Sequence, residues 1–351
     1  MGPFIFLYTI LIALYVLTLH NQKRKSSRAI QAVFCAVVLI AIQGLRHNDI
    51  GIDSCNTYRP FFESVTSGLS NLFDFDDIYY GFELGFIVFT KFVKTMFDNT
   101  QFYIILCSII SIAPVAYLIY KYSKNIPLSF IIFSSFIVYH FGFSGIRQAM
   151  AVGVTCLAFE CLMQKKAILF IIITLIASSI HSSAILFLIS YPLYHHLCLS
   201  PAKLIIFGGI FVICLFIGDS IVIGLTELIF GGEKYLSKLM EDAVPSYNLM
   251  ILLTAILLFT FTSNNDQILK FRSMLLMAVV FQSLGLISSS ASRMAYYFIP
   301  YLSIALPMTT NSFRLRHLLE VGLIFLMVTF FFYLNGSGYL GVIPYKFFWV
   351  Q

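Results

Sequence analysis

Long runs of apolar residues, separated by short polar stretches, follow one another along most of the chain. A hydrocarbon core of about 30 Å is crossed by about 20 residues of α-helix, so most runs are long enough to span it wholly or nearly. The pattern predicts about twelve transmembrane helices. They cover residues 3–19, 29–45, 102–120, 127–141, 149–163, 167–180, 183–197, 203–218, 248–262, 273–290, 294–310 and 318–334. We therefore predict an all-α polytopic membrane protein in which residues 1–351 form a single transmembrane bundle.

The composition supports this class and excludes several others. Hydrophobic residues make up 59% of the chain and charged residues only 11%, whereas soluble domains carry about 25% charged residues. Basic residues lie at helix ends and form no basic face, so nucleic acid is not an expected partner. The seven cysteines are an odd number and lie mostly in apolar runs, which indicates neither a disulfide framework nor a zinc site.

The distribution of charge predicts an orientation. Cytoplasmic loops of membrane proteins carry an excess of Lys and Arg. If the loop that holds Lys23, Arg24, Lys25 and Arg28 is cytoplasmic, helix alternation puts 13 of the 22 basic residues on that side, but only 3 of the 16 acidic ones. Two long stretches, 46–101 and 219–247, are then extracytoplasmic loops. Within the first, we interpret residues 82–97 as an interfacial helix with Lys91 and Lys94 on one face.

In this orientation four ionisable residues from separate helices reach the same extracytoplasmic rim: Arg46, Arg147, His181 and Arg293. Arg147 follows a glycine-containing connection at 142–145, and His181 lies in a serine-rich segment where a helix breaks. Ionisable groups at such a depth are costly and usually face a cavity or a ligand. The alternatives are that the arginines only anchor topology and that His181 only bonds a carbonyl of the broken helix.

The chemistry of these residues suits an anionic ligand. The planar guanidinium group donates two parallel hydrogen bonds to phosphate oxygens and keeps its charge at any working pH. A histidine near the arginines can take a proton from an attacking hydroxyl, because its ordinary pKa of about 6.5 lies near the operating pH. We therefore predict a diphosphate site with a histidine base.

The segments around these residues resemble the EpsG family of exopolysaccharide and O-antigen polymerases, which are Wzy-like bacterial membrane glycosyltransferases. The matching segments are Gly44-Leu45-Arg46, Gly51-Ile52-Asp53 with Tyr58, Phe82-Glu83, Gly145-Ile146-Arg147-Gln148-Ala149, Ile180-His181-Ser182-Ser183-Ala184 and Arg293-Met294-Ala295-Tyr296-Tyr297-Phe298. Their order covers residues 44 to about 300.

The resemblance implies a bundle similar to the GT-C glycosyltransferases in the bacterial inner membrane, with its active site facing the periplasm. The implied donor is undecaprenyl diphosphate carrying an oligosaccharide, and the acceptor is a new lipid-linked repeat unit. Carried over to this chain, Arg147 and Arg293 bind the diphosphate and Arg46 assists. Asp53 and Glu83 position acceptor hydroxyls or arginines, and His181 is the base. The glycan is expected at Tyr58, Gln148, Tyr296 and Tyr297.

We expect neither a cofactor nor a metal ion, because fixed guanidinium groups stabilise the charge of a diphosphate leaving group by themselves. The expected partners are the bilayer, the lipid-linked oligosaccharide and a chain-length regulator. Two other functions use a related ligand: an O-antigen ligase shares the donor, and a flippase of lipid-linked oligosaccharide also needs arginines. The candidate charges gather at one rim, whereas transporters usually hold theirs near the midplane, which favours an enzyme.

Overall fold

The computed structural model describes residues 1–19, 25–68, 72–73, 81–196, 247–263, 265–286, 292–336 and 338–350. These residues form helices and one isolated antiparallel bridge, between Arg46 and Phe347. The predicted all-helical class is confirmed. The helices belong to two compact units, residues 1–188 with 313–351 (unit 1) and residues 189–312 (unit 2), and each unit is described by itself. The predicted helix at 203–218 and the predicted loop at 219–247 lie outside the described residues, apart from residue 247.

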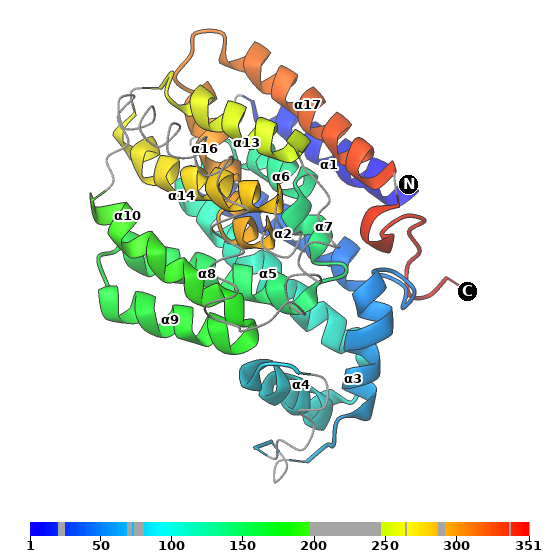
Figure 1. Ribbon diagram of the computed structural model, residues 1–351. Helices are drawn as coiled ribbons and strands as arrows, with labels where there is room; N and C mark the ends of the chain where they lie inside the picture. The colour runs from blue at the N-terminus through cyan, green and yellow to red at the C-terminus, as the bar shows by residue number, and fades with distance from the viewer. Residues whose placement is uncertain are drawn as a thin grey trace. The chain divides into compact units, whose positions relative to one another are not determined.

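Unit 1 contains most of the long helices (Figure 1). Its α-helices are α1 (Gly2–Thr18), α2 (Lys25–Gly44), α3 (Arg59–Ser64), α4 (Leu84–Phe97), α5 (Thr100–Tyr122), α6 (Ile126–Ser135), α7 (Ile137–Phe141), α8 (Ile146–Met163), α9 (Ala167–Ile180) and α17 (Arg316–Gly336). It also has a π-helical turn, η1 (Ser54–Tyr58), and two 3₁₀ segments, η4 (Ser182–Ile189) and η8 (Tyr339–Gly341).

Unit 2 consists of shorter elements. They are α10 (Ser190–His196), α13 (Tyr247–Thr260), α14 (Asp266–Ser283), α16 (Leu302–Thr310) and the 3₁₀ segments η5 (Leu284–Leu286), η6 (Arg293–Tyr297) and η7 (Ile299–Tyr301). Pro300 stands inside η7, where its missing N–H disfavours the continuous helix predicted over 294–310.

Four helices among the described residues are long and apolar enough to cross a membrane. They cover Ser26–Gly44, Thr100–Tyr122, Ile146–Met163 and Arg316–Gly336. Shorter apolar helices cover Gly2–Thr18, Ile126–Ser135, Ala167–Ile180 and Asn248–Thr260. The chain is therefore a membrane protein, and the total of about twelve spans stays a prediction.

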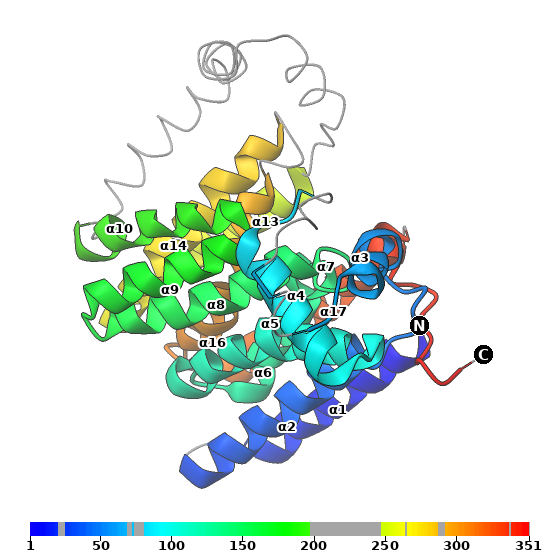
Figure 2. The same ribbon diagram turned by 90° about the horizontal axis from the view of Figure 1, so that it is seen from below.

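The directions of the helices in unit 1 define two ends. Gln101 at the start of α5 donates to the Gly44 carbonyl at the end of α2, so these helices are antiparallel. At the far end of the same pair, Arg28 donates to the carbonyls of Tyr120 and Ser123, at 2.9 Å each. Figure 2 shows α2 and α5 from below. We call the end of unit 1 at Gly44 the rim.

Helices α5 and α8 run in the same direction and pack closely. A β-carbon at Gly153 of α8 would lie 2.2 Å from the carbonyl oxygen of Ile110 in α5. Lys121 of α5 forms an ion pair with Glu160 of α8 at the end opposite the rim. Since α8 begins at the rim and α9 returns along it, the end of α9 also reaches the rim (Figure 1).

Two helices predicted as continuous are broken. The predicted helix 127–141 is interrupted at Phe136, whose backbone is extended with φ −86° and ψ 156°. The hydroxyls of Ser134 and Ser135 both donate to the Ile131 carbonyl, and such serine bonds compete with the regular ladder. His140 contacts the Ser134 carbonyl, which the break leaves without a helical donor. The predicted helix 183–197 is instead a 3₁₀ segment followed by α10.

Helix α14 begins seven residues earlier than predicted, at Asp266 instead of 273. The side chain of Asn265 accepts a hydrogen bond from the Gln267 N–H and caps the helix. Arg272, which made this stretch look polar, is buried and donates to the carbonyls of Thr260 and Ser263. Because the charged group of Arg272 donates to carbonyls at and just after the end of α13, it does not prevent α14 from running through residues 266–273.

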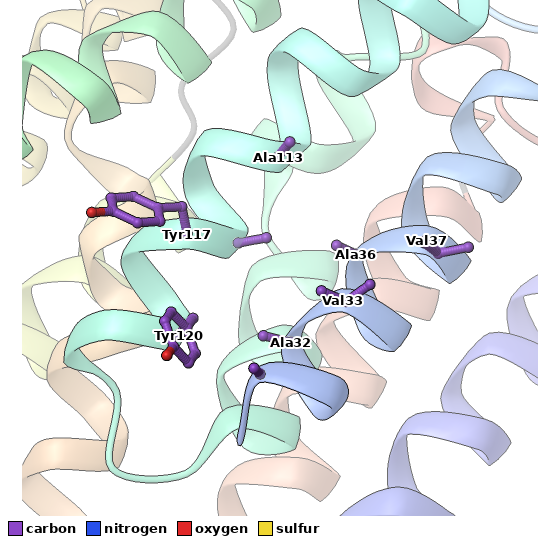
Figure 3. A pocket seen from close by; sticks show the side chains of 9 residues that line it. Ala32, Val33, Ala36, Val37, Ala113, Tyr117 and Tyr120 are labelled. Atoms are coloured by element: carbon purple, nitrogen blue, oxygen red, sulfur yellow. The ribbon is translucent and has the colours of Figure 1, made fainter. Parts of the chain in front are cut away.

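An apolar groove of about 430 Å³ lies between α2 and α5 (Figure 3). Its lining residues are Ala29, Ala32, Val33, Ala36, Val37, Ala113, Ala116, Tyr117 and Tyr120. Small side chains on both helices leave this hollow beside an otherwise close-packed pair. The groove lies along two membrane-length helices, so apolar material fits it best.

The close approach of α5 and α8 predicts a strong effect of added volume. We expect Gly153→Ala to destabilise the protein by about 1–3 kcal/mol, because its methyl group would overlap the Ile110 carbonyl. Thermal unfolding in detergent measures this as a lower Tm. Gly322→Ala in α17 is the matched control, because its methyl group would meet no atom within 4 Å, and its Tm is expected to be unchanged or higher. A Gly153→Ala variant as stable as the wild type would contradict the packing described.

Candidate active site

The rim of unit 1 collects residues from distant parts of the sequence. Arg46 lies just after α2, Arg147 is in the first turn of α8, and His181 directly follows α9. Glu83 immediately precedes α4, which packs against α9, and Figure 1 shows α4 at the lower edge of the bundle. A β-carbon at Gly85 would lie only 2.2 Å from the Ser179 hydroxyl, so α4 approaches the end of α9 very closely.

The carboxylate of Glu83 is the centre of this group. One oxygen, Oε2, lies 2.5 Å from Arg147 Nη1. The other, Oε1, accepts the backbone N–H of Ser182 at 2.8 Å and lies 3.3 Å from His181 Nδ1. One carboxylate thus connects the segment before α4 with the start of α8 and the segment after α9.

These contacts fix the charge of Glu83. Burial raises its pKa, but the contact with His181, the N–H of Ser182 and the charge of Arg147 outweigh burial and lower the pKa from 4.5 to about 2. The carboxylate is therefore ionised at any physiological pH, and its ion pair with Arg147 is permanent in this arrangement.

The Arg147 guanidinium lies against aromatic rings. Its Cζ is 4.3 Å from the centre of the Phe82 ring, and the Phe82 ring stacks on Tyr58 with 5.8 Å between centroids. Its Nε donates to the Tyr58 hydroxyl at 3.4 Å. Nε and Nη1 are therefore used, whereas Nη2 makes no hydrogen bond within the described part of the chain. With a side chain 18% exposed, Arg147 is rigidly held and still has a donor for a ligand.

The imidazole ring of His181 makes no hydrogen bond to the residues that the structure describes. Its Nδ1 is buried and near Glu83, yet the geometry falls short of an aligned hydrogen bond, so the contact is mainly electrostatic. A carboxylate beside Nδ1 favours the tautomer with its proton on that nitrogen, which leaves a lone pair on Nε2. No described residue bonds Nε2, and the side chain is 24% exposed. The ring therefore presents a basic nitrogen away from Glu83.

Asp53 is bound to the connection before α8. Its carboxylate accepts the hydroxyl proton of Ser144 at 2.9 Å, and its backbone N–H donates to the same hydroxyl oxygen at 3.0 Å. Gly51, with φ +90°, allows this approach, because a β-carbon there would lie 1.9 Å from the Phe143 carbonyl oxygen. Asp53 forms no ion pair with an arginine among the described residues. Its bonds to Ser144 instead position the 142–145 connection.

Arg46 differs from the expected ligand-binding arginine. Its side chain is only 1% exposed and donates to the Gln43 carbonyl at 2.5 Å and to the Ser54 hydroxyl at 3.2 Å. Burial lowers its pKa to about 10, so the group remains protonated at neutral pH. Its Cζ lies 5.5 Å from the centre of the Phe143 ring. The buried Arg46 side chain thus connects the end of α2 with the η1 turn.

The remaining predicted residues lie elsewhere or are covered. Gln148 is 4% exposed in the first turn of α8. In unit 2, Arg293 is exposed at the start of η6, and Tyr296 and Tyr297 are buried at 3% and 0% exposure. The structure thus brings together Glu83, Arg147, His181 and Tyr58. The approach of Arg293, Tyr296 and Tyr297 to this group stays a prediction.

Sequence reasoning missed three contributors to the site. Phe82 supports the Arg147 guanidinium, Ser144 holds Asp53, and the Ser182 N–H fixes Glu83. Each of them is adjacent to a predicted residue or stands within a singled-out segment. Their roles depend on contacts between residues 65 to 99 positions apart, which no local pattern in the sequence signals.

The low pKa of Glu83 predicts a pH-dependent stability. A carboxyl group with a depressed pKa in the folded state stabilises the protein above its ordinary pKa, and this contribution is lost as pH falls toward the folded pKa. We expect the Tm difference between wild type and Glu83→Gln to be largest above pH 4.5 and to shrink between 4.5 and about 2. Glu63→Gln, in the exposed pair with Arg59, is the matched control with little expected effect. A Glu83 difference that is constant across this range would contradict the assignment.

Comparison with known proteins identifies the family. A sequence model of the EpsG family matches residues 29–347, which is nearly the whole chain and includes every rim residue described above. Neither the curated proteins nor the solved structures contain a match to this chain. On the extent of the family match, the chain belongs to the EpsG family, a family of Wzy-like polymerases.

Proposed function

We propose that this protein elongates a bacterial polysaccharide by transferring a growing glycan from undecaprenyl diphosphate to the sugar of a new lipid-linked repeat unit. The proposal places the reaction at the rim of unit 1, on the periplasmic side of the inner membrane. The observation that carries it is the single carboxylate of Glu83, which holds a guanidinium group and an imidazole side by side. Membership of a Wzy-like family supports the reaction class.

Arg147 is proposed to bind the diphosphate. Its Nη2 is left without a partner among the described residues, and its plane is fixed by Phe82 and Glu83. Negative charge develops on the diphosphate as it leaves, and a preoriented guanidinium group in a water-poor site stabilises that charge. We assign Arg46, which is buried and bonded to the Gln43 carbonyl and the Ser54 hydroxyl, a positioning role.

His181 is proposed as the general base. The acceptor hydroxyl attacks the anomeric carbon of the donor glycan, and its proton passes to His181 Nε2. The bond between that carbon and the phosphate oxygen breaks, and the electron pair leaves with the lipid diphosphate. Glu83 beside Nδ1 stabilises the imidazolium ion that forms, as a carboxylate does for a catalytic histidine in other enzymes. No metal ion is required by this scheme.

Three substitutions test the assigned roles in the host cell. We expect Arg147→Ala to lower polymer formation by about 10²-fold or more, because a charge-stabilising donor is lost. Arg147→Lys keeps the charge but loses the planar fork, and we expect it to recover only part of the activity. His181→Gln is expected to reduce polymer formation by about 10²-fold or more through loss of the base. The polysaccharide is separated on gels and the length distribution is measured.

The gel pattern also separates the alternative functions. A polymerase defect leaves a lipopolysaccharide core that carries one repeat unit, whereas a ligase or flippase defect leaves a bare core. Arg59→Ala is the matched control: this arginine lies in the same segment of the chain but pairs with Glu63, and its side chain is 37% exposed. Normal ladders from both Arg147→Ala and His181→Gln would refute the proposed roles, and a bare lipopolysaccharide core would refute the assignment as a polymerase.

A further inference from the structure

The segment after α17 forms a strap across the rim. This strap, residues 338–350, is bonded to the loop that follows α2. The N–H of His47 donates to the Lys346 carbonyl at 2.8 Å, and the N–H of Phe348 donates to the Leu45 carbonyl at 2.9 Å. The Tyr345 hydroxyl donates to the Ile42 carbonyl at 2.6 Å, inside α2. These bonds fix the strap to the end of a membrane-length helix.

The outer part of the strap is aromatic and exposed. Phe348, Trp349 and Val350 are 45%, 59% and 41% exposed. The rings of Phe347 and Trp349 stack with 4.6 Å between centroids and an angle of 4°. We call residues 347–350 the aromatic tip. It is held by the stacking of Phe347 and Trp349 and by the backbone bond from Phe348 to Leu45.

The position of the aromatic tip selects its environment. Leu45, to which it is bonded, directly follows the membrane-length helix that ends at Gly44. The tip therefore lies at the level where that helix leaves the hydrocarbon core. Tryptophan prefers this level, because its ring is apolar and its N–H needs a polar partner. Lys346 beside the tip is exposed, and its long side chain can place the ammonium group in the polar headgroup layer.

We propose that the aromatic tip is a membrane anchor that inserts Phe348 and Trp349 into the lipid headgroup region at the rim. Through the strap it fixes the depth of the site. The N–H of Gly51 donates to the Gly341 carbonyl of the strap at 3.1 Å. Gly51 packs on the connection that precedes Arg147, and Asp53 bonds Ser144 of that connection. Two contacts, between Gly341 and Gly51 and between Asp53 and Ser144, therefore connect the strap with the segment that directly precedes Arg147.

The chain offers a direct test, because Trp349 is its sole tryptophan. Purified wild-type protein is reconstituted in vesicles of phosphatidylethanolamine and phosphatidylglycerol, and the tryptophan fluorescence is recorded. Lipids with bromine near the headgroup end of the acyl chain are compared with lipids brominated near the chain terminus, and iodide is added to the water. We expect a larger loss of emission with the shallow bromine than with the deep one, and a smaller loss with iodide than for a free indole.

A relocated tryptophan calibrates the depth scale. Phe325, in the middle of α17, is 75% exposed, so the double variant Trp349→Phe with Phe325→Trp is expected to be quenched most by the deep bromine. Three results for Trp349 would overturn the anchor. These are full iodide quenching without lipid quenching, protection from iodide and from both lipids, and strongest quenching by the deep bromine. The fluorescence measurement requires no catalytic activity, so its result tests the anchor independently of the proposed function.

Discussion

The ion pair between Glu83 and Arg147 is the interaction on which the rim depends. The two charges come from segments that are 64 residues apart, and both side chains are 18% exposed. Removing one partner of a largely buried ion pair leaves the other charge without compensation, which usually costs more than the pair itself contributes. The same carboxylate also binds the Ser182 N–H, so one residue fixes the start of α8 and the segment after α9 together.

Close backbone approaches make this arrangement possible. Glycine at 85 lets α4 contact Ser179, and glycine at 51 lets the loop after α2 contact Phe143. Membrane helices pack through small residues because no hydrophobic force draws apolar helices together in lipid. The close packing at Gly51 and Gly85 brings the polar groups of the rim, such as Glu83 and Arg147, within bonding distance of each other. Glu83 and Arg147 are accordingly held by several contacts, while His181 Nε2 and Arg147 Nη2 make no hydrogen bond to the residues that the structure describes.

Much of unit 1 could be predicted from the sequence, because long apolar runs leave little choice of structure in lipid. Helix α9 was predicted with its exact bounds, and the gathering of Arg46, Arg147 and His181 at one end follows from helix direction. The break at Phe136 was missed, since serine bonds to the helix backbone leave no trace in hydropathy. The start of α14 was misplaced because Arg272 turns inward to carbonyls.

The site itself was predictable in its members more than in its contacts. The sequence indicated Glu83, Arg147 and His181 as site residues. Which of them are in contact depends on how α4 packs, because Glu83 directly precedes this helix, and no pattern in the sequence predicts that packing. Lys91 and Lys94, expected on one face of an interfacial helix, are largely covered: Lys91 is 1% exposed, and Lys94 Nζ lies 5.1 Å from the centre of the Phe62 ring. The burial of Arg46 was equally unpredictable, because its side chain contacts Ser54 and Phe143, which lie in other segments of the chain.

A double-mutant cycle of Glu83→Gln and Arg147→Gln tests the central interaction most directly. The free energy of unfolding is measured for the wild type, both single variants and the double variant in the same mixed micelles. If Glu83 holds Arg147 as described, the double variant loses less stability than the sum of the single losses, with a coupling of about 0.5–3 kcal/mol. Losses that add within about 0.3–0.5 kcal/mol would show that the two residues act independently, and the account of the rim would be wrong.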